Sequence, residues 1–294
     1  MKILLVGGSG HVGTFLTPYL SKENEIRILD LHDPQHDVEF VRGSIDDPVV
    51  LKEALSGMGA FVTMVMQGGQ DGVERTHTIS QAQSNYAVNC TGLHLLLLTA
   101  FEMKIPYGVH TSTMSVHQRK RRYYPSEEDV PMDGPNVYGL TKRFSEEICR
   151  YFAREYDMSI AALRITGPRT RAQFLKQYAD PPRRPWGTPL YITDEEDLAR
   201  AYLAALSYVS KGHGRFDSFF ISGDSDHDEV NMSKAKMLLG WEPRAHLAQA
   251  YPQGIRPQAN RAAYASAKSP KTKAFSSGST RVLPSASVTI KVAM

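Results

Sequence analysis

A tyrosine and a lysine four residues apart are the clearest candidates for proton chemistry in this chain. Tyr138 and Lys142 lie in the motif Tyr-Gly-Leu-Thr-Lys, within a segment from 136 to about 157 whose apolar spacing predicts a helix. Residues four apart share one helix face. A free phenol, with a pKa near ~10, is a poor base at neutral pH, but a nearby ammonium favours the phenolate. The spacing alone is weak evidence, because it also occurs by chance in many surface helices.

Hydroxyl side chains are expected beside this pair. A predicted strand over 105–111 is followed directly by Ser112 and Thr113. Side chains at the carboxyl end of a parallel strand point into the crevice where such sheets bind ligands. One of these hydroxyls is therefore predicted to hold the reacting substrate oxygen toward Tyr138, and Ser112 and Thr113 are the predicted substrate contacts. The alternative is that Ser and Thr are simply common where strands end.

The elements that would position these groups begin in the first thirteen residues, MKILLVGGSGHVG. An apolar run typical of a buried parallel strand leads into Gly7, Gly10 and Gly13. Glycines at this spacing permit a tight turn and close approach to a pyrophosphate. The predicted helix, which opens with His11 and Val12, would direct its unpaired N–H groups at the phosphates.

A second predicted strand ends in Asp30, twenty residues after Gly10. A carboxylate at this place accepts hydrogen bonds from ribose hydroxyls and repels a 2′-phosphate. Together with the glycines it predicts a dinucleotide site that favours NAD over NADP. Gln67 and Gly68, which follow the fourth predicted strand, are expected to line the same crevice.

Strands and helices alternate through most of the chain, which predicts an α/β fold with a doubly wound parallel sheet, the Rossmann fold. We expect an NAD-binding core over residues 1–165 and a small substrate-binding part over 166–251, interleaved with the last sheet elements. A basic tail over 252–294 has a composition that favours disorder. The predicted strands lie near 2–6, 25–30, 38–41, 60–66, 105–111, 159–164 and 188–192.

These motifs resemble the extended short-chain dehydrogenase/reductases, the NAD-dependent epimerase/dehydratase family. The resemblance runs from Met1 to about Pro243. It is carried by Gly7-x-x-Gly10-x-x-Gly13, Asp30, Ser112-Thr113-x-x-Val116, Tyr138-x-x-x-Lys142 and Leu239-Gly-Trp-Glu-Pro243. It implies that Thr113 and Tyr138 are catalytic and that Lys142 assists and binds the nicotinamide ribose.

Further positions follow from the same resemblance. Asn89 matches the family's asparagine on the helix before the serine/threonine strand, which implies a place at the cofactor. Arginines 169, 171, 183 and 184 lie where the family's substrate-binding part begins, and Arg171 is the predicted partner of an anionic substrate group. Met114-Ser115 stands where sugar dehydratases of the family carry an Asp-Glu pair, which argues against dehydration.

Composition excludes several other classes. The formal net charge of +3 is due to the tail, since residues 1–251 hold 27 basic and 31 acidic side chains. Nucleic acid is therefore not an expected partner. No apolar run is long enough to span a membrane, no metal site is predicted, and the two cysteines suggest a reducing cytoplasm. Long predicted helices near 74–101 and 136–157 make a helix-paired homodimer plausible.

The favoured function is NAD-dependent oxidation of a free sugar or sugar acid. Little chain is left after the predicted sheet to wrap a substrate, and the compact form resembles the uronate dehydrogenases, with Gly68-Gly69 and Leu239-Gly-Trp as shared features. Two alternatives stay open: a sugar or nucleotide-sugar epimerase that retains its cofactor, and a non-catalytic NAD-sensing protein.

Overall fold

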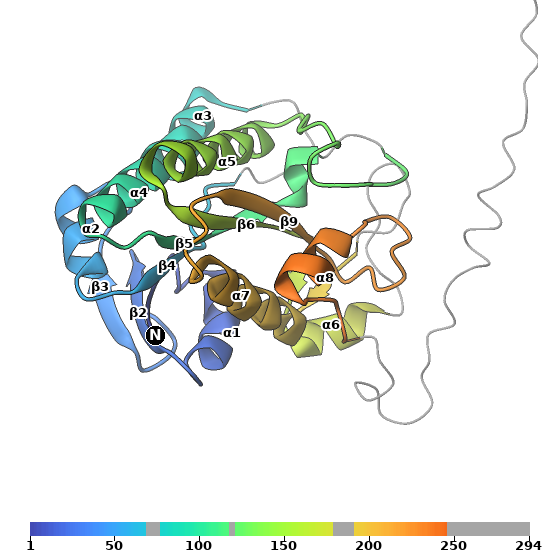
Figure 1. Cartoon of the computed structure of the whole chain (residues 1–294), viewed down its shortest axis with the longest axis horizontal. Helices are drawn as coiled ribbons and strands as arrows, with labels where there is room; N and C mark the ends of the chain where they lie inside the picture. Colours follow the sequence, from blue (N-terminus) through green and yellow to red (C-terminus); the bar gives the residue numbers. More distant parts are fainter. Residues whose placement is uncertain (69–76, 118–120, 179–190, 246–294) are drawn as a thin grey trace, which may run out of the picture. The chain divides into compact units, whose positions relative to one another are not determined.

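The computed structural model describes residues 1–68, 77–117, 121–178 and 191–245 (Figure 1). These residues lie within one compact unit, Met1–Ile255. The expected tail at 252–294 lies outside the described residues. No helix among the described residues is long and apolar enough to cross a membrane.

The described residues form a central sheet of seven strands in the order β3-β2-β1-β4-β5-β6-β9, and every neighbouring pair is parallel. The order reverses between β1 and β4, which opens the crevice where such sheets bind ligands. The strands are β1 Lys2–Val6, β2 Glu25–Asp30, β3 Glu39–Arg42, β4 Ala60–Thr63, β5 Tyr107–Thr113, β6 Ser159–Ile165 and β9 Phe216–Ile221. The predicted α/β fold class is confirmed.

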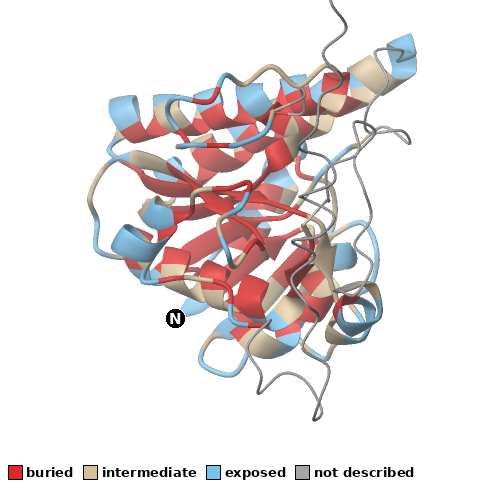
Figure 2. Cartoon of the chain, turned by 90° about the vertical axis from the view of Figure 1, so that its right-hand side faces the viewer, coloured by how far each residue is buried: buried red, intermediate tan, exposed pale blue. Residues whose placement is uncertain are grey.

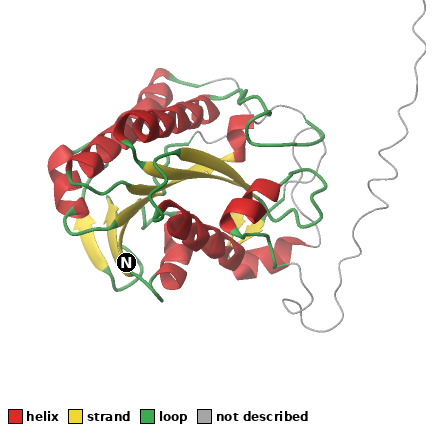
Figure 3. Ribbon diagram, viewed as in Figure 1, coloured by secondary structure: helices red, strands yellow, loops and turns green. Residues whose placement is uncertain are grey.

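Helices cover both faces of the sheet, and the strands between them are buried (Figures 2 and 3). Apolar side chains of α1 and α7 pack on one face, and those of α2, α4 and α5 pack on the other. Burial on both faces explains why the strands are apolar runs rather than alternating patterns. The helices are α1 His11–Leu20, α2 Pro48–Leu55, α3 Ile79–Tyr86, α4 Leu93–Glu102, α5 Val137–Tyr156, α6 Arg171–Tyr178, α7 Glu195–Val209 and α8 Ser233–Leu239.

Several predicted elements differ in extent, and the strand expected at 60–66 ends at Thr63. The strand expected at 105–111 runs on to Thr113, because Ser112 and Thr113 still pair with β6. The strand expected at 188–192 is replaced, within the described residues, by the two-residue β8 (Thr193–Asp194), which pairs with β7 (Pro168–Arg169). The helix expected at 74–101 is divided by a π-helical turn at Ala87–Gly92.

The start of α5 is fixed by its capping residue and by a glycine. Asn136 caps the helix, and its Oδ1 accepts a hydrogen bond of 2.7 Å from the Gly139 backbone N–H. A Cβ on Gly139 would lie 2.7 Å from the Ser115 carbonyl oxygen. Glycine therefore allows the first turn of α5, which carries Tyr138, to pack directly on the segment that follows Thr113.

Candidate active site

The glycine turn after β1 has the geometry of a phosphate cradle. Gly7 has a φ of +84°, which glycine adopts without strain, and a Cβ there would lie 2.7 Å from the Val65 backbone nitrogen. A Cβ on Gly13 would lie 2.3 Å from the Gly8 carbonyl oxygen. The α1 N-cap, Gly10, supplies no side chain to the first N–H groups of the helix. These N–H groups are therefore suited to an anionic ligand such as a pyrophosphate.

Asp30 lies at the carboxyl end of β2 and is hydrogen-bonded to this turn. Its Oδ2 accepts a hydrogen bond of 3.0 Å from the Ser9 backbone N–H, and its Oδ1 accepts one of 3.0 Å from His32. The structure thus brings Asp30 together with the glycines, as predicted. Arg42 ends the adjacent strand, but its guanidinium already contacts the Leu31 carbonyl and Asp33.

Asn89 holds the segment after β4 in place through hydrogen bonds. Its Oδ1 accepts a 3.0 Å hydrogen bond from the Gln67 N–H, and its Nδ2 donates to the Gln67 carbonyl at 2.9 Å and to Thr141 Oγ1 at 3.0 Å. The side chain is only 3 % exposed. Asn89 therefore shapes the cofactor crevice by holding the backbone of Gln67. Gly68 follows at the edge of the described residues, and Gly69 lies outside them.

Thr113 and Tyr138 come together at the carboxyl end of β5. Burial raises the pKa of Tyr138 to about 12, and a hydrogen bond with Thr113 opposes this rise. The Tyr138 hydroxyl also lies 3.5 Å from the sulfur of Met66. No sequence motif predicted this contact. A substrate hydroxyl placed between the threonine and the phenol would meet one hydrogen-bonding group and one proton acceptor.

Lys142 lies one helical turn further along α5 and is 2 % exposed. Its Nζ is 3.5 Å from Nε2 of His110, and burial lowers the lysine pKa to about 8. The expectation that Lys142 depresses the Tyr138 pKa is not supported by these contacts. Burial dominates at the tyrosine, and the lysine contacts a histidine inside the protein.

Two predicted substrate contacts are engaged elsewhere. Ser112 is 1 % exposed, and its hydroxyl donates a 2.5 Å hydrogen bond to Glu146 on α5. The Ser112 hydroxyl therefore faces α5, and its contact with substrate stays a prediction. Arg171 pairs with Glu196 at 2.7 Å and with Asp194 at 3.1 Å. Arg183 and Arg184 lie outside the described residues.

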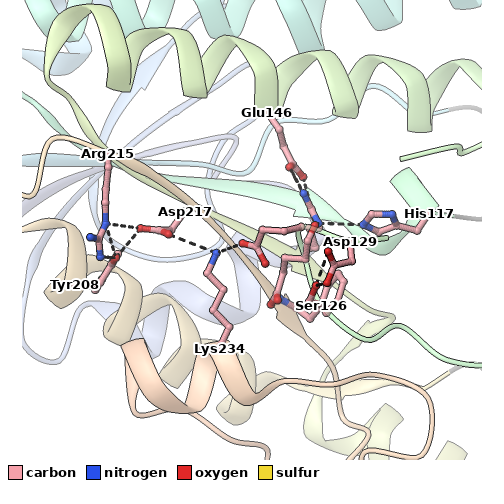
Figure 4. A network of polar contacts seen from close by, with 12 residues as sticks. His117, Ser126, Asp129, Glu146, Tyr208, Arg215, Asp217 and Lys234 are labelled. Carbon is pink, nitrogen blue, oxygen red and sulfur yellow. Dashed lines mark hydrogen bonds and ion pairs between the residues drawn. The ribbon is translucent and has the colours of Figure 1, made fainter. Parts of the chain in front are cut away.

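The structure also contains a buried network of charged side chains that the sequence did not predict (Figure 4). Arg164 is 2 % exposed and donates to Glu146 through Nε at 2.9 Å and Nη2 at 2.7 Å. Its Nη1 donates to His117 Nε2 at 3.1 Å and to the Glu127 carbonyl at 2.8 Å. Burial alone would raise the pKa of Glu146, but Arg164 holds it below its ordinary value. One signal was available: Tyr138, Lys142 and Glu146 recur every four residues along α5.

The fold and the glycine turn define a dinucleotide-binding α/β enzyme with a tyrosine–lysine pair. A family model described as the NAD dependent epimerase/dehydratase family matches residues 3–178, more than half of the chain. The chain belongs to this family, and NAD is its cofactor. The glycine turn and Asp30 fit that cofactor, because the first leaves room for the pyrophosphate and the second accepts from ribose hydroxyls.

Known proteins resemble the chain more distantly. It is 20 % identical over 269 residues to an NAD-dependent glucose-6-phosphate dehydrogenase from Haloferax volcanii, covering 84 % of this chain and 94 % of that protein. It is 26 % identical over 171 residues to a UDP-glucose 4-epimerase from Lactobacillus helveticus, covering 56 % of this chain and 51 % of that protein. The chain thus matches about half the length of that epimerase.

Solved structures share the fold. A short-chain dehydrogenase/reductase superfamily protein from Agrobacterium tumefaciens with bound NAD superposes with a TM-score of 0.69 at 21 % identity, covering 83 % of this chain and 93 % of that chain. A structure described as a mutated uronate dehydrogenase gives a TM-score of 0.65 at 18 % identity, covering 87 % of this chain and 88 % of that chain.

Proposed function

We propose that this enzyme oxidises a hydroxyl group of a free sugar or sugar acid and transfers its hydride to NAD. The observation that carries the proposal is the meeting of Thr113 and Tyr138 at the carboxyl end of β5, where the segment after β4 contacts both the Tyr138 phenol and the glycine turn. An alcohol-binding hydroxyl, a proton acceptor and a dinucleotide cradle would thus lie together at the carboxyl ends of the parallel strands.

The residues divide the work as follows. Thr113 holds the substrate hydroxyl, and Tyr138 takes its proton while the carbon–hydrogen bond breaks. With NAD bound, Lys142 would donate hydrogen bonds to the nicotinamide ribose. NAD, when bound, supplies the hydride acceptor and a positive charge that favours the phenolate. That charge matters because burial leaves the Tyr138 pKa at about 12 in the protein alone.

Chain length supports a small substrate. The described chain after β6 must also build β8, α7, β9 and α8, which leaves a short stretch to wrap a nucleotide. The relative matched over 94 % of its own length is a glucose-6-phosphate dehydrogenase, which by its name acts on a sugar without a nucleotide. Recognition of an acidic sugar by Arg171 stays a prediction, because two carboxylates already hold this arginine.

A second candidate is a sugar epimerase, which would oxidise, turn and re-reduce its substrate. Its support is the partial match to UDP-glucose 4-epimerases. Adding NAD and a panel of hexuronates, aldoses and sugar phosphates, and following NADH absorbance, separates the candidates. A dehydrogenase accumulates NADH, whereas an epimerase converts the sugar with no net NADH. A protein that binds NAD and changes no sugar would be the non-catalytic sensor and would overturn the proposal.

We also propose that the protein forms a homodimer and works in the reducing cytoplasm. Exposed apolar side chains lie on α3 and α5: Tyr86 is 40 % exposed, Phe144 39 % and Tyr151 39 %. Tyr86 and Phe144 are also in ring contact, so that α3 and α5 share an exposed apolar surface suited to helix pairing. Sedimentation velocity tests it, since Phe144→Glu should yield monomers and a monomeric parent protein would contradict it. Cys90 and Cys149 are free thiols, which suits a reducing compartment.

A further inference from the structure

His110 lies on β5, three residues before Thr113, and is 2 % exposed. It is the register partner of Thr63 on β4, and its Nδ1 is 2.9 Å from Thr63 Oγ1. Its other ring nitrogen, Nε2, is 3.5 Å from Lys142 Nζ on α5. One imidazole therefore connects two strands of the sheet with the lysine of the tyrosine–lysine pair.

The two contacts fix the proton arrangement of the ring. A lysine ammonium only donates hydrogen bonds, so Nε2 must accept from Lys142 and stay unprotonated. A neutral ring then carries its proton on Nδ1, which donates to Thr63 Oγ1. Burial and the neighbouring ammonium both push the pKa of His110 well below its ordinary value. The ring is therefore a neutral acceptor over the working pH range.

Lys142 depends on this acceptor. Within the described parts of the chain, no other hydrogen-bond partner of its ammonium is found. Burial lowers the lysine pKa to about 8, whereas Cys149 and Glu146 on α5 and Cys90 on the π-helical turn oppose the shift. Glu146 already accepts from Arg164 and Ser112. Removing the histidine nitrogen would leave a buried cation unpaired, which disfavours its charged form.

We propose that His110 is a positioning residue that holds the Lys142 ammonium at the back of the cofactor crevice through Nε2, with Thr63 fixing the ring. The role in turnover rests on the proposed function, but the role in holding Lys142 does not. The lysine must be charged to donate fully to the nicotinamide ribose. Loss of the acceptor therefore weakens NAD binding at neutral and alkaline pH.

A matched pair of variants separates the two ring nitrogens. His110→Gln can place its amide oxygen where Nε2 lies and keep the contact with Lys142. His110→Asn reaches only the position of Nδ1 and keeps the contact with Thr63. NAD affinity is measured by calorimetry from pH 6 to 10, the Lys142 pKa is read by ¹⁵N NMR in the cofactor-free protein, and thermal melting reports the fold.

For His110→Asn we expect the lysine pKa to fall by about one unit, so that NAD binds about fivefold more weakly at pH 8. His110→Gln should stay within about twofold of the parent protein. Equal loss in both variants, or no loss in either, would overturn the proposal. Should the variants not fold, long-range ¹H–¹⁵N NMR of the parent protein decides, because a proton on Nε2 of His110 contradicts the assignment. None of these measurements needs a substrate, so they stand even if the proposed reaction fails.

Discussion

The two sides of the sheet's switch point are built from different kinds of contact. On the β1–β2 side, the cradle rests on backbone groups, such as the glycine turn and the Ser9 N–H that donates to Asp30. On the β5–β6 side, Arg164 gathers Glu146, His117 and Glu127 from separate segments, up to 47 residues away. The first side is specified by a local motif, whereas the second exists only once the chain has folded. Substitutions on the first side should therefore affect ligand binding, and substitutions on the second side should affect stability. Substitutions of the catalytic residues should affect turnover.

The largest effect is expected on turnover, from Tyr138→Phe, which should change neither cofactor binding nor stability. The phenol proton is lost and the ring remains, so turnover should fall by roughly 10²–10⁴-fold. NAD affinity and the melting temperature should barely change. Steady-state kinetics and calorimetry on the same sample check this. Turnover close to that of the parent enzyme would remove Tyr138 from the mechanism.

Next in size is Arg164→Met, which breaks the buried network. Glu146, fully buried, would lose its positive partner, and leaving one buried charge unpaired costs about 3–5 kcal/mol. Urea unfolding should show this loss. Adding Glu146→Gln removes the orphaned charge and should recover part of it. A single variant as stable as the parent would mean that the pair does not stabilise the second side.

A smaller effect concerns pH. Burial and Arg164 lower the pKa of His117 from 6.5 to about 4. Between these values the unfolded chain binds a proton that the folded protein does not, so stability falls as pH falls. The loss should reach about 2 kcal/mol near pH 5. His117→Gln keeps an acceptor for Arg164 but does not titrate, so its unfolding free energy should depend less on pH. Parallel profiles for both proteins would rule out His117 as the source.

The smallest of these effects is on the β1–β2 side. Asp30→Ala should weaken NAD binding about tenfold, because a charged acceptor of the ribose hydroxyls is lost. It should also narrow the preference for NAD over NADP, with the fold unchanged. Titration with both cofactors measures the ratio. Equal affinity of the parent protein for NAD and NADP would contradict the role given to Asp30.

The same contrast explains what could be predicted from the sequence. The glycine turn, Asp30 and the α/β class with a parallel sheet follow from local spacing and apolar runs, and the structure confirms this fold class. Ser112 stays a predicted substrate contact, but β5 runs two residues further than expected and the Ser112 hydroxyl is hydrogen-bonded to Glu146. The partners of Lys142 and Arg164 come from segments 18 to 47 residues away, and no single-sequence pattern specifies such pairings.

If the enzyme oxidises a small, unactivated sugar, a comparison of substrates under identical conditions will show it. NADH formation is followed with hexuronates and aldoses on one side and with UDP- and dTDP-sugars on the other. Steady NADH accumulation is expected with at least one free sugar or sugar acid, and no rate of the same order with any nucleotide sugar. Efficient conversion of a nucleotide sugar while the free sugars stay inert would contradict it.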